Sequence, residues 1–139
     1  MANETTGNLI LFTSRYQNKE LIKAHPELLP LGFTLGAPRW KLTYQTGGNL
    51  RQLGPQPDFR YDEDRSSFRS AYRAHLDTLG VAGVASLIWA ALKGSNDPRI
   101  AGAVLLCFED LEDPTQWCHR QFFAEWWEEK TGQPVLELA

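Results

Sequence analysis

Short apolar runs alternate with amphipathic segments along this chain of 139 residues. Three of the runs, Asn8–Thr13, Leu31–Leu35 and Gly102–Phe108, are largely apolar at consecutive positions, which predicts strands that are buried on both faces. The run Gly102–Phe108 is the most apolar of the three and is expected at the centre of a parallel sheet. A last short strand is expected within Gln133–Ala139.

The segments between these runs carry apolar residues at helical spacing. Asp64 or Ser66 is expected to cap the second predicted helix, and Gly80 is expected to end it. Asp113, with Pro114 at the first helical position, is expected to begin the last helix. The predicted helices are Lys19–Ala24, a segment with Phe68, Tyr72, Leu76 and Leu79 on one face, Val81–Lys93, and Pro114–Lys130.

Alternating strands and helices predict an α/β layered fold with a short, mostly parallel sheet, and the length suits a single domain over residues 1–139. Ligands of such sheets bind beyond the carboxyl ends of the strands. The loops after Thr13, Leu35 and Phe108 are therefore expected to meet at one site. The segment Lys41–Asp64 is rich in Gly, Pro, Gln and Asp and is expected to be a long connection, either a lid or a substrate-facing segment.

Composition narrows the class of protein. The chain is 42% apolar and has a net charge of −3, which argues against disorder and against a strongly basic surface for nucleic acid. The charge is uneven, because the part from Met1 to Arg73 is basic and rich in arginine. No apolar run approaches a membrane span of about 18 residues, so a cytoplasmic protein without a membrane partner is expected. The two cysteines are then expected to be thiols.

The candidate chemistry is concentrated near the last predicted helix. Cys118, His119 and Arg120 are expected at the helix start, where the free N–H groups lower the pKa of a thiol and bind anions. Cys118 is the candidate nucleophile or redox thiol, His119 the candidate proton carrier, and Glu109 is expected to orient His119 or to bind a sugar hydroxyl. The residues expected to bind substrate are Arg120, Ser14, Arg15, Arg39 and Cys107.

Other interpretations of these residues remain open at this stage. Cys107, Cys118 and His119 are ligand types that zinc accepts. The sequence spacing is unusual for zinc, however, and adjacent residues on a helix point to different faces, so no metal site is assigned. Cys107 can instead be a packing residue, or form a reversible disulfide with Cys118. The aromatic residues of the last helix are interpreted mainly as core, with base stacking as an alternative, and they weakly suggest a homodimer.

The motifs Leu105-Leu106-Cys107-Phe108-Glu109 and Cys118-His119-Arg120 resemble those of the DUF488 family. The segments Ser14-Arg15-Tyr16 and Pro38-Arg39-Trp40 agree with one branch of that family. The chain departs from the commoner form, because Thr34-Leu35-Gly36 stands where that form has an Asp-Val-Arg strand. The resemblance implies a Rossmann-like α/β domain with a pocket at these motifs, and a role in processing nucleotides or nucleic acids.

Three functions follow as hypotheses. The first is an enzyme that acts on a nucleotide, nucleic acid or other phosphate-bearing substrate through Cys118, His119 and Arg120. The second is a domain that binds a nucleotide or a protein without turnover, and the third is a metal-dependent enzyme. The sequence names no cofactor, substrate or reaction, and it leaves open whether the protein is an enzyme.

Overall fold

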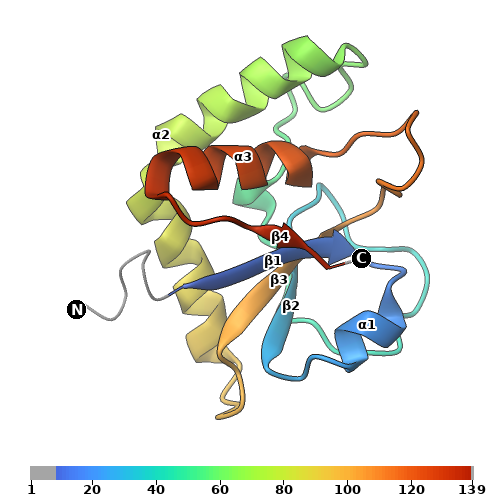
Figure 1. Ribbon diagram of the computed structural model, residues 1–139, viewed down its shortest axis with the longest axis vertical. Coiled ribbons are helices and arrows are strands. Elements are labelled where there is room, and N and C mark those ends of the chain that lie inside the picture. Colours follow the sequence, from blue (N-terminus) through green and yellow to red (C-terminus); the bar gives the residue numbers. More distant parts are fainter. Residues whose placement is uncertain (1–8, 139) are drawn as a thin grey trace.

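The computed structural model describes residues 9–138, in which helices cover both faces of a four-stranded parallel sheet (Figure 1). The strand order is β2-β3-β1-β4, so the two longest strands are central. This confirms the predicted α/β architecture, which is that of a small Rossmann-like layered fold. The strands are β1 (Ile10–Arg15), β2 (Leu28–Gly32), β3 (Gly102–Cys107) and β4 (Leu136–Glu137), and the helices are α1 (Lys19–Lys23), η3 (Arg51–Leu53), α2 (Arg65–Gly94) and α3 (His119–Thr131).

The central strand β3 is buried at all six positions, as its apolar sequence predicts. Because successive side chains of a strand point to opposite faces, Leu105 and Cys107 belong to the core under α2 and α3, whereas Val104 and Leu106 belong to the smaller core that includes Ile22 of α1. This alternation aims the Cys107 side chain at α3.

Two predicted strands differ from the observed ones in their limits. β1 begins at Ile10, and the predicted start at Asn8 lies outside the described residues. β2 is Leu28–Gly32 instead of Leu31–Leu35, and it pairs with β3 from Leu28 onward. Phe33 still donates to the Leu106 carbonyl of β3 at 3.3 Å, and the chain then leaves the sheet. Asn49 takes over the backbone of Thr34, accepting from its N–H at 3.1 Å and donating to its carbonyl at 2.8 Å.

The helix α2 bends at Gly80, whose φ of 72° and ψ of 165° are not helical. The sequence predicts a break at this residue, and the break is confirmed. Asp64 caps the helix by accepting from the Ser66 N–H at 3.0 Å, also as predicted. Among the described helices, α2 alone is long and apolar enough to cross a membrane, with a mean hydropathy of 1.4 over 18 residues. Its buried residues pack in the core beneath it.

The last helix starts later than predicted. Asp113 does not cap a helix, because its carboxylate accepts from the N–H and hydroxyl of Thr115 within a turn. The helix α3 starts at His119, and Cys118 is its N-cap in an extended conformation, with φ of −142° and ψ of 150°. Gln121 completes a capping box by accepting from the Cys118 N–H at 3.1 Å.

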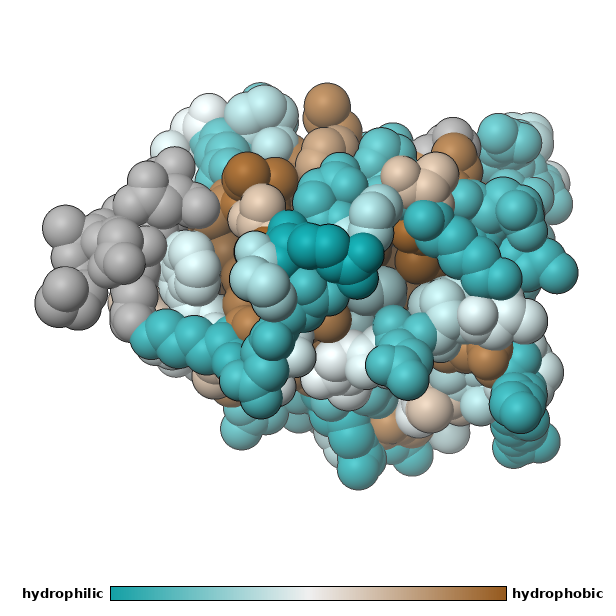
Figure 2. Space-filling model, turned by 90° about the horizontal axis from the view of Figure 1, so that it is seen from below, coloured by the Kyte–Doolittle hydropathy of each residue, from teal (hydrophilic) through white to brown (hydrophobic). Residues whose placement is uncertain are grey.

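The aromatic residues of α3 are buried within the chain. Phe122, Phe123, Trp126 and Trp127 all belong to the core between the sheet and α2. Figure 2 shows that the face seen from below is mostly hydrophilic, with hydrophobic patches separated from one another. The interpretation of these aromatic residues as core is therefore the one that the structure supports.

Candidate functional site

A pocket of about 370 Å³ opens at the carboxyl end of the sheet, where β2 and β3 end and α3 begins. Glu109, Cys118 and His119, the three residues predicted to be catalytic, all line it. The segment 41–64 also contributes, so this long connection faces the pocket. Other lining residues are Thr34, Arg60, Asp62, Phe68, Phe108 and Trp117.

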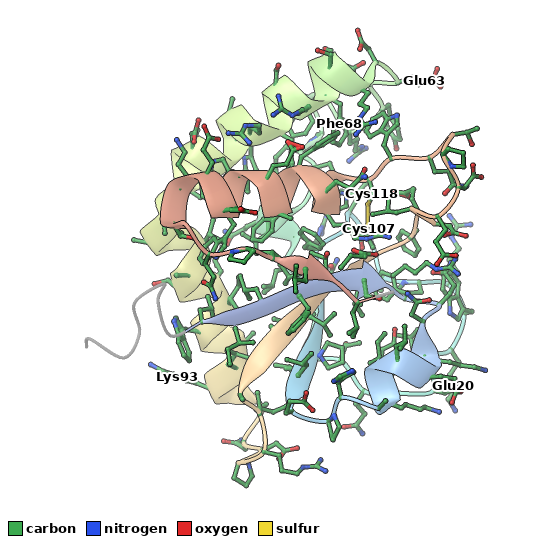
Figure 3. All side chains as sticks on the ribbon, in the orientation of Figure 1. Glu20, Glu63, Phe68, Lys93, Cys107 and Cys118 are labelled. Atoms are coloured by element: carbon green, nitrogen blue, oxygen red, sulfur yellow. A yellow bond between two sulfur atoms is a disulfide. The ribbon has the colours of Figure 1, made fainter. Side chains whose placement is uncertain are left out.

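Cys107 and Cys118 form a disulfide that joins the end of β3 to the start of α3 (Figure 3). Their sulfurs come together because Cys107 points to the α3 side of the sheet and Cys118 caps α3 directly above it. Both residues are buried, with exposed fractions of 0% and 1%. The structure thus contains the disulfide, which the sequence offered as one interpretation, and not the free thiols that the sequence led us to expect.

His119 is held in one orientation and one tautomer. Its Nε2 lies 2.9 Å from the carbonyl oxygen of Phe33, an acceptor, so Nε2 carries the proton. The unprotonated Nδ1 then faces Cys118 Sγ at 3.6 Å. The rings of Phe33 and Tyr72 pack edge-on against the imidazole. Burial lowers the pKa of His119 to about 3, so the ring is neutral at neutral pH.

Arg120 is buried beneath the cysteines, with an exposed fraction of 1%. Its Nε and Nη2 donate to the carboxylate of Glu137 on β4, and its Nη1 donates to Cys107 Sγ at 2.9 Å. All three nitrogens of the Arg120 guanidinium group therefore donate to protein groups, namely Glu137 and Cys107. The guanidinium is placed to stabilise a thiolate at Cys107 more directly than a substrate in the pocket.

Glu109 follows β3 by two residues and is half-buried at the pocket wall. Burial raises the pKa of its carboxyl group, and the charge of Arg120 offsets part of that rise. No hydrogen bond from Glu109 to His119 is found among the described residues, so the orienting role expected of Glu109 belongs to the Phe33 carbonyl.

The remaining predicted residues lie apart from this pocket. Ser14 is buried and donates to the Leu138 carbonyl at 2.6 Å. Arg15 lines a separate cavity of about 280 Å³ with Arg120, and its guanidinium lies 3.9 Å from Asp110. Arg39 is exposed in the segment after β2. The structure therefore brings Cys107, Cys118, His119, Glu109 and Arg120 together. Ser14, Arg15 and Arg39 do not line the pocket at Cys118, and of these three only Arg15 shares a cavity with Arg120.

Arg60 is the functional candidate that sequence reasoning does not single out. Its Nε is buried with no hydrogen-bond partner among the described residues, and its guanidinium lies 4.8 Å from the centre of the Tyr61 ring. Arg60 lines the pocket that contains Cys118. The arginine-rich first half of the chain was the only signal for it, and that signal did not separate Arg60 from its neighbours.

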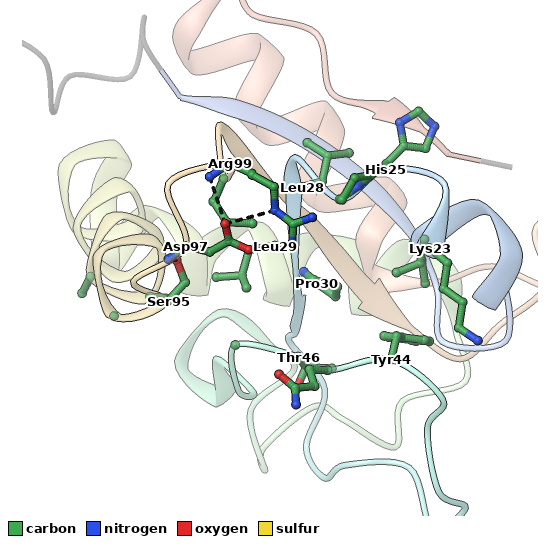
Figure 4. A pocket seen from close by; sticks show the side chains of 18 residues that line it. Lys23, His25, Leu28, Leu29, Pro30, Tyr44, Thr46, Ser95, Asp97 and Arg99 are labelled. Atoms are coloured by element: carbon green, nitrogen blue, oxygen red, sulfur yellow. Dashed lines mark hydrogen bonds and ion pairs between the residues drawn. The ribbon is translucent and has the colours of Figure 1, made fainter.

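A larger cavity of about 790 Å³ lies along the edge strand β2, between α1 and the end of α2 (Figure 4). Its charged residues include Asp97 and Arg99, which pair with each other at 2.9 Å. Neither cysteine lines it. We assign the candidate site to the smaller pocket, because reactive groups converge there and a larger volume alone supplies no chemistry.

Comparisons with family models, with curated proteins and with solved structures gave no match for this chain. The resemblance to the DUF488 family therefore stays a prediction, carried by the two short motifs around Cys107 and Cys118. Geometry supports a site here, because two cysteines, a neutral histidine and a half-buried carboxyl group gather at the carboxyl end of a parallel sheet.

Proposed function

We propose that this protein is an enzyme that acts on a nucleotide, nucleic acid or other phosphate-bearing substrate in the pocket at Cys118. One observation carries the proposal: Cys118, His119 and Glu109 line the same pocket as Arg60, a cation whose Nε has no hydrogen-bond partner within residues 9–138. A pocket of about 370 Å³ is within the range of small-molecule sites, which is roughly 300–1,000 Å³.

The pocket walls suit a ligand with an anionic group and a planar or sugar part. Arg60 offers donors to a phosphate, and the nearby Asp62 limits the net positive charge. Phe68, Phe108 and Trp117 supply apolar surface against which a base can pack. In this proposal Arg60 takes the anion-binding role that the sequence suggests for Arg120.

Cys118 is the proposed nucleophile in the reduced protein. Its thiol donates a hydrogen bond to Nδ1 of His119, which lies 3.6 Å from Sγ and is unprotonated because Nε2 donates to Phe33. Because the pKa of His119 is about 3, the imidazole orients the thiol, and the thiol proton passes to water when the thiolate forms. The positive charge of Arg120, which contacts Cys107, favours negative charge on the neighbouring sulfurs. Glu109, with its raised pKa, is suited to return a proton to a leaving group.

Thiol labelling tests this proposal. Reduced protein in the presence of a metal chelator is treated with iodoacetamide at neutral pH, with and without a panel of nucleoside phosphates, and each cysteine is followed by mass spectrometry. We expect Cys118 to react faster than Cys107 and a nucleoside phosphate to slow its reaction. Arg60→Gln is expected to remove that protection, whereas Arg99→Gln, on the larger cavity, is the matched control and should keep it.

The proposal fails if both cysteines label slowly at equal rates, or if no member of the panel changes the rate. A second candidate, a binding domain without turnover, is favoured by the burial of both sulfurs, which limits their access to a substrate. Slow labelling together with saturable nucleotide binding, measured by calorimetry, would support that candidate instead.

We further propose a cytoplasmic protein, in which the cysteines alternate between thiols and the disulfide. The bend of α2 at Gly80 and the packing of one face of the helix on the core favour a helix of the folded domain over a membrane span. A homodimer stays a prediction. The aromatic residues of α3 that suggested it are buried within one chain, so they supply no free apolar face.

A further inference from the structure

We propose that Cys107, Cys118 and His119 bind a zinc ion when the cysteines are reduced, with Glu109 as the fourth ligand. The ligand atoms of these four residues all lie within 4.8 Å of one another. Thiolate sulfur, imidazole nitrogen and carboxylate oxygen are the donors that zinc takes in tetrahedral sites. The inference concerns the site of the proposed function but does not depend on its substrate.

The extended conformation of Cys118 makes this arrangement feasible. Adjacent residues inside a helix point to different faces, which counts against a Cys-His pair as ligands of one ion. Cys118 is the N-cap, however, with φ of −142° and ψ of 150°, and only His119 has helical geometry. The change of conformation between the two residues turns both side chains toward the end of β3.

The imidazole is already oriented as a ligand. Its Nε2–H is bonded to the Phe33 carbonyl, so the lone pair of Nδ1 is directed at Cys118. Metal-binding histidines commonly donate their other N–H to a backbone carbonyl in this way. The distance of 3.6 Å between Nδ1 and Sγ equals the tetrahedral edge of about 3.6 Å expected for zinc bonds to nitrogen and sulfur.

The two sulfurs can reach the same ion. The Cα atoms of Cys107 and Cys118 are 7.5 Å apart, beyond the range of about 4.4–6.8 Å that most disulfides span. Around zinc the sulfurs would lie about 3.8 Å apart, a separation that the wider backbone spacing accommodates. The Nη1 of Arg120 donates to Cys107 Sγ at 2.9 Å, a contact that stabilises a metal-bound thiolate.

Zinc and the disulfide exclude each other, because both use the same sulfurs. Oxidation by a peroxide would release the metal: the two thiolates give two electrons to hydrogen peroxide, the S–S bond forms and the O–O bond breaks. Two protons from solvent complete two water molecules, and zinc leaves as the free ion. Zinc-bound Cys118 is withheld from electrophiles, so the metal also controls the thiol that the proposed function needs.

Metal titration tests the zinc site. The full chain is reduced with a phosphine, freed of metal and titrated with zinc, and separately with cobalt(II), whose absorption reports tetrahedral geometry and thiolate ligation. We expect one zinc per chain and a cobalt spectrum with thiolate charge-transfer bands. Hydrogen peroxide should then release one zinc per chain, measured with a chromophoric chelator, as the disulfide forms.

Variants assign the ligands. Cys118→Ser and Glu109→Gln are expected to weaken zinc binding by more than about 10-fold, and Asp113→Asn, in an exposed turn, is the control that should not. Zinc far below one per chain in reduced, folded protein, or full affinity in Cys118→Ser, would overturn the inference. The cobalt spectrum of the unmodified chain gives an answer even if a variant does not fold. The labelling test above is done in chelator, so the two proposals fail independently.

Discussion

Arg120 is a buried cation whose main partner is a single carboxylate. Its side chain has an exposed fraction of 1%, and that of Glu137, which accepts from Nε and Nη2, has 29%. Removing one partner of a buried ion pair leaves an uncompensated charge, which costs more than the pair contributes when it is intact. Glu137 also accepts from Thr13 at 2.7 Å, so it connects β4, β1 and α3 at the cysteine site.

At this residue scale we expect Glu137→Gln to lower the free energy of unfolding by about 1–3 kcal/mol, because the amide cannot balance the buried guanidinium. Glu125→Gln is the matched control. Its partner Arg69 is exposed, with side-chain exposures of 46% and 44% for the pair, and surface pairs contribute less than about 1 kcal/mol. Urea unfolding of the two variants measures the difference. Equal losses would show that Arg120 does not depend on Glu137.

The helix α2 illustrates how one residue shapes an element. Phe68, Tyr72 and Leu76 before the bend and Val84 and Ile88 after it are all buried, so both halves pack on the core. Gly80 allows this with a φ of 72°, which L-residues with a side chain rarely adopt. A straight helix of 30 residues would span about 45 Å and could not follow so small a sheet.

At the element scale we expect Gly80→Ala to destabilise the protein by about 1–2 kcal/mol. A Cβ at this position meets nothing within 4 Å, so the cost comes from the backbone conformation alone. Gly83→Ala is the control in the same helix: its φ is helical, its Cβ would make an ordinary contact at 3.7 Å with Leu79, and higher helix propensity should stabilise it by about 0.5–1 kcal/mol. Thermal unfolding measures the two melting temperatures. Melting temperatures that change in the same direction in both variants would contradict this account of the bend.

At the scale of the whole molecule, α2 and α3 form a helical layer over one face of the sheet. At the surface of this layer, the carboxylate of Asp77 connects the two helices. Asp77 of α2 accepts from Trp126 Nε1 at 2.8 Å and lies 3.7 Å from Lys130 of α3. The hydrogen bond from Trp126, helped by Lys130 and Arg73, lowers the pKa of Asp77 below its ordinary value of 3.8. The ionised carboxylate therefore stabilises the folded chain.

A carboxyl group with a lowered pKa stabilises the fold fully above its ordinary pKa, and this contribution disappears as the pH falls through the lowered value. We expect Asp77→Asn to be less stable than the unmodified protein at neutral pH, by less than about 1 kcal/mol because the side chain is half exposed. The gap should close as the pH falls below 3.8. Urea unfolding across the acid range measures it, and the titration of His119 cancels because both chains contain it. A gap that is constant with pH would refute the role of the charge.

The sequence by itself determined the layers of the fold, and it predicted where the candidate site lies. The apolar run Gly102–Phe108 could only be a buried central strand, and the Gly80 break follows from local backbone preference. The start of α3 could not be predicted, because both Asp113 and Cys118 precede residues that can form a helix. In the structure the carboxylate of Asp113 accepts a hydrogen bond from Thr115 within a turn, and Cys118 is the N-cap. Sequence reasoning also could not foresee that Arg120 would be engaged by Glu137 or that Arg60 would line the pocket, since those positions depend on contacts distant in the chain.

The tertiary structure alone decided which reactive groups meet. The sequence supplied Cys107, Cys118, His119 and Glu109 as candidates. If Cys118 and His119 were both inside a helix, however, their side chains would point to different faces. The extended N-cap conformation of Cys118 and the Phe33 carbonyl, which fixes His119, bring the four candidate ligand atoms within 4.8 Å of one another. The local sequence sets which reactive groups are present. These groups come together only when β2, β3 and α3 pack against one another in the folded chain.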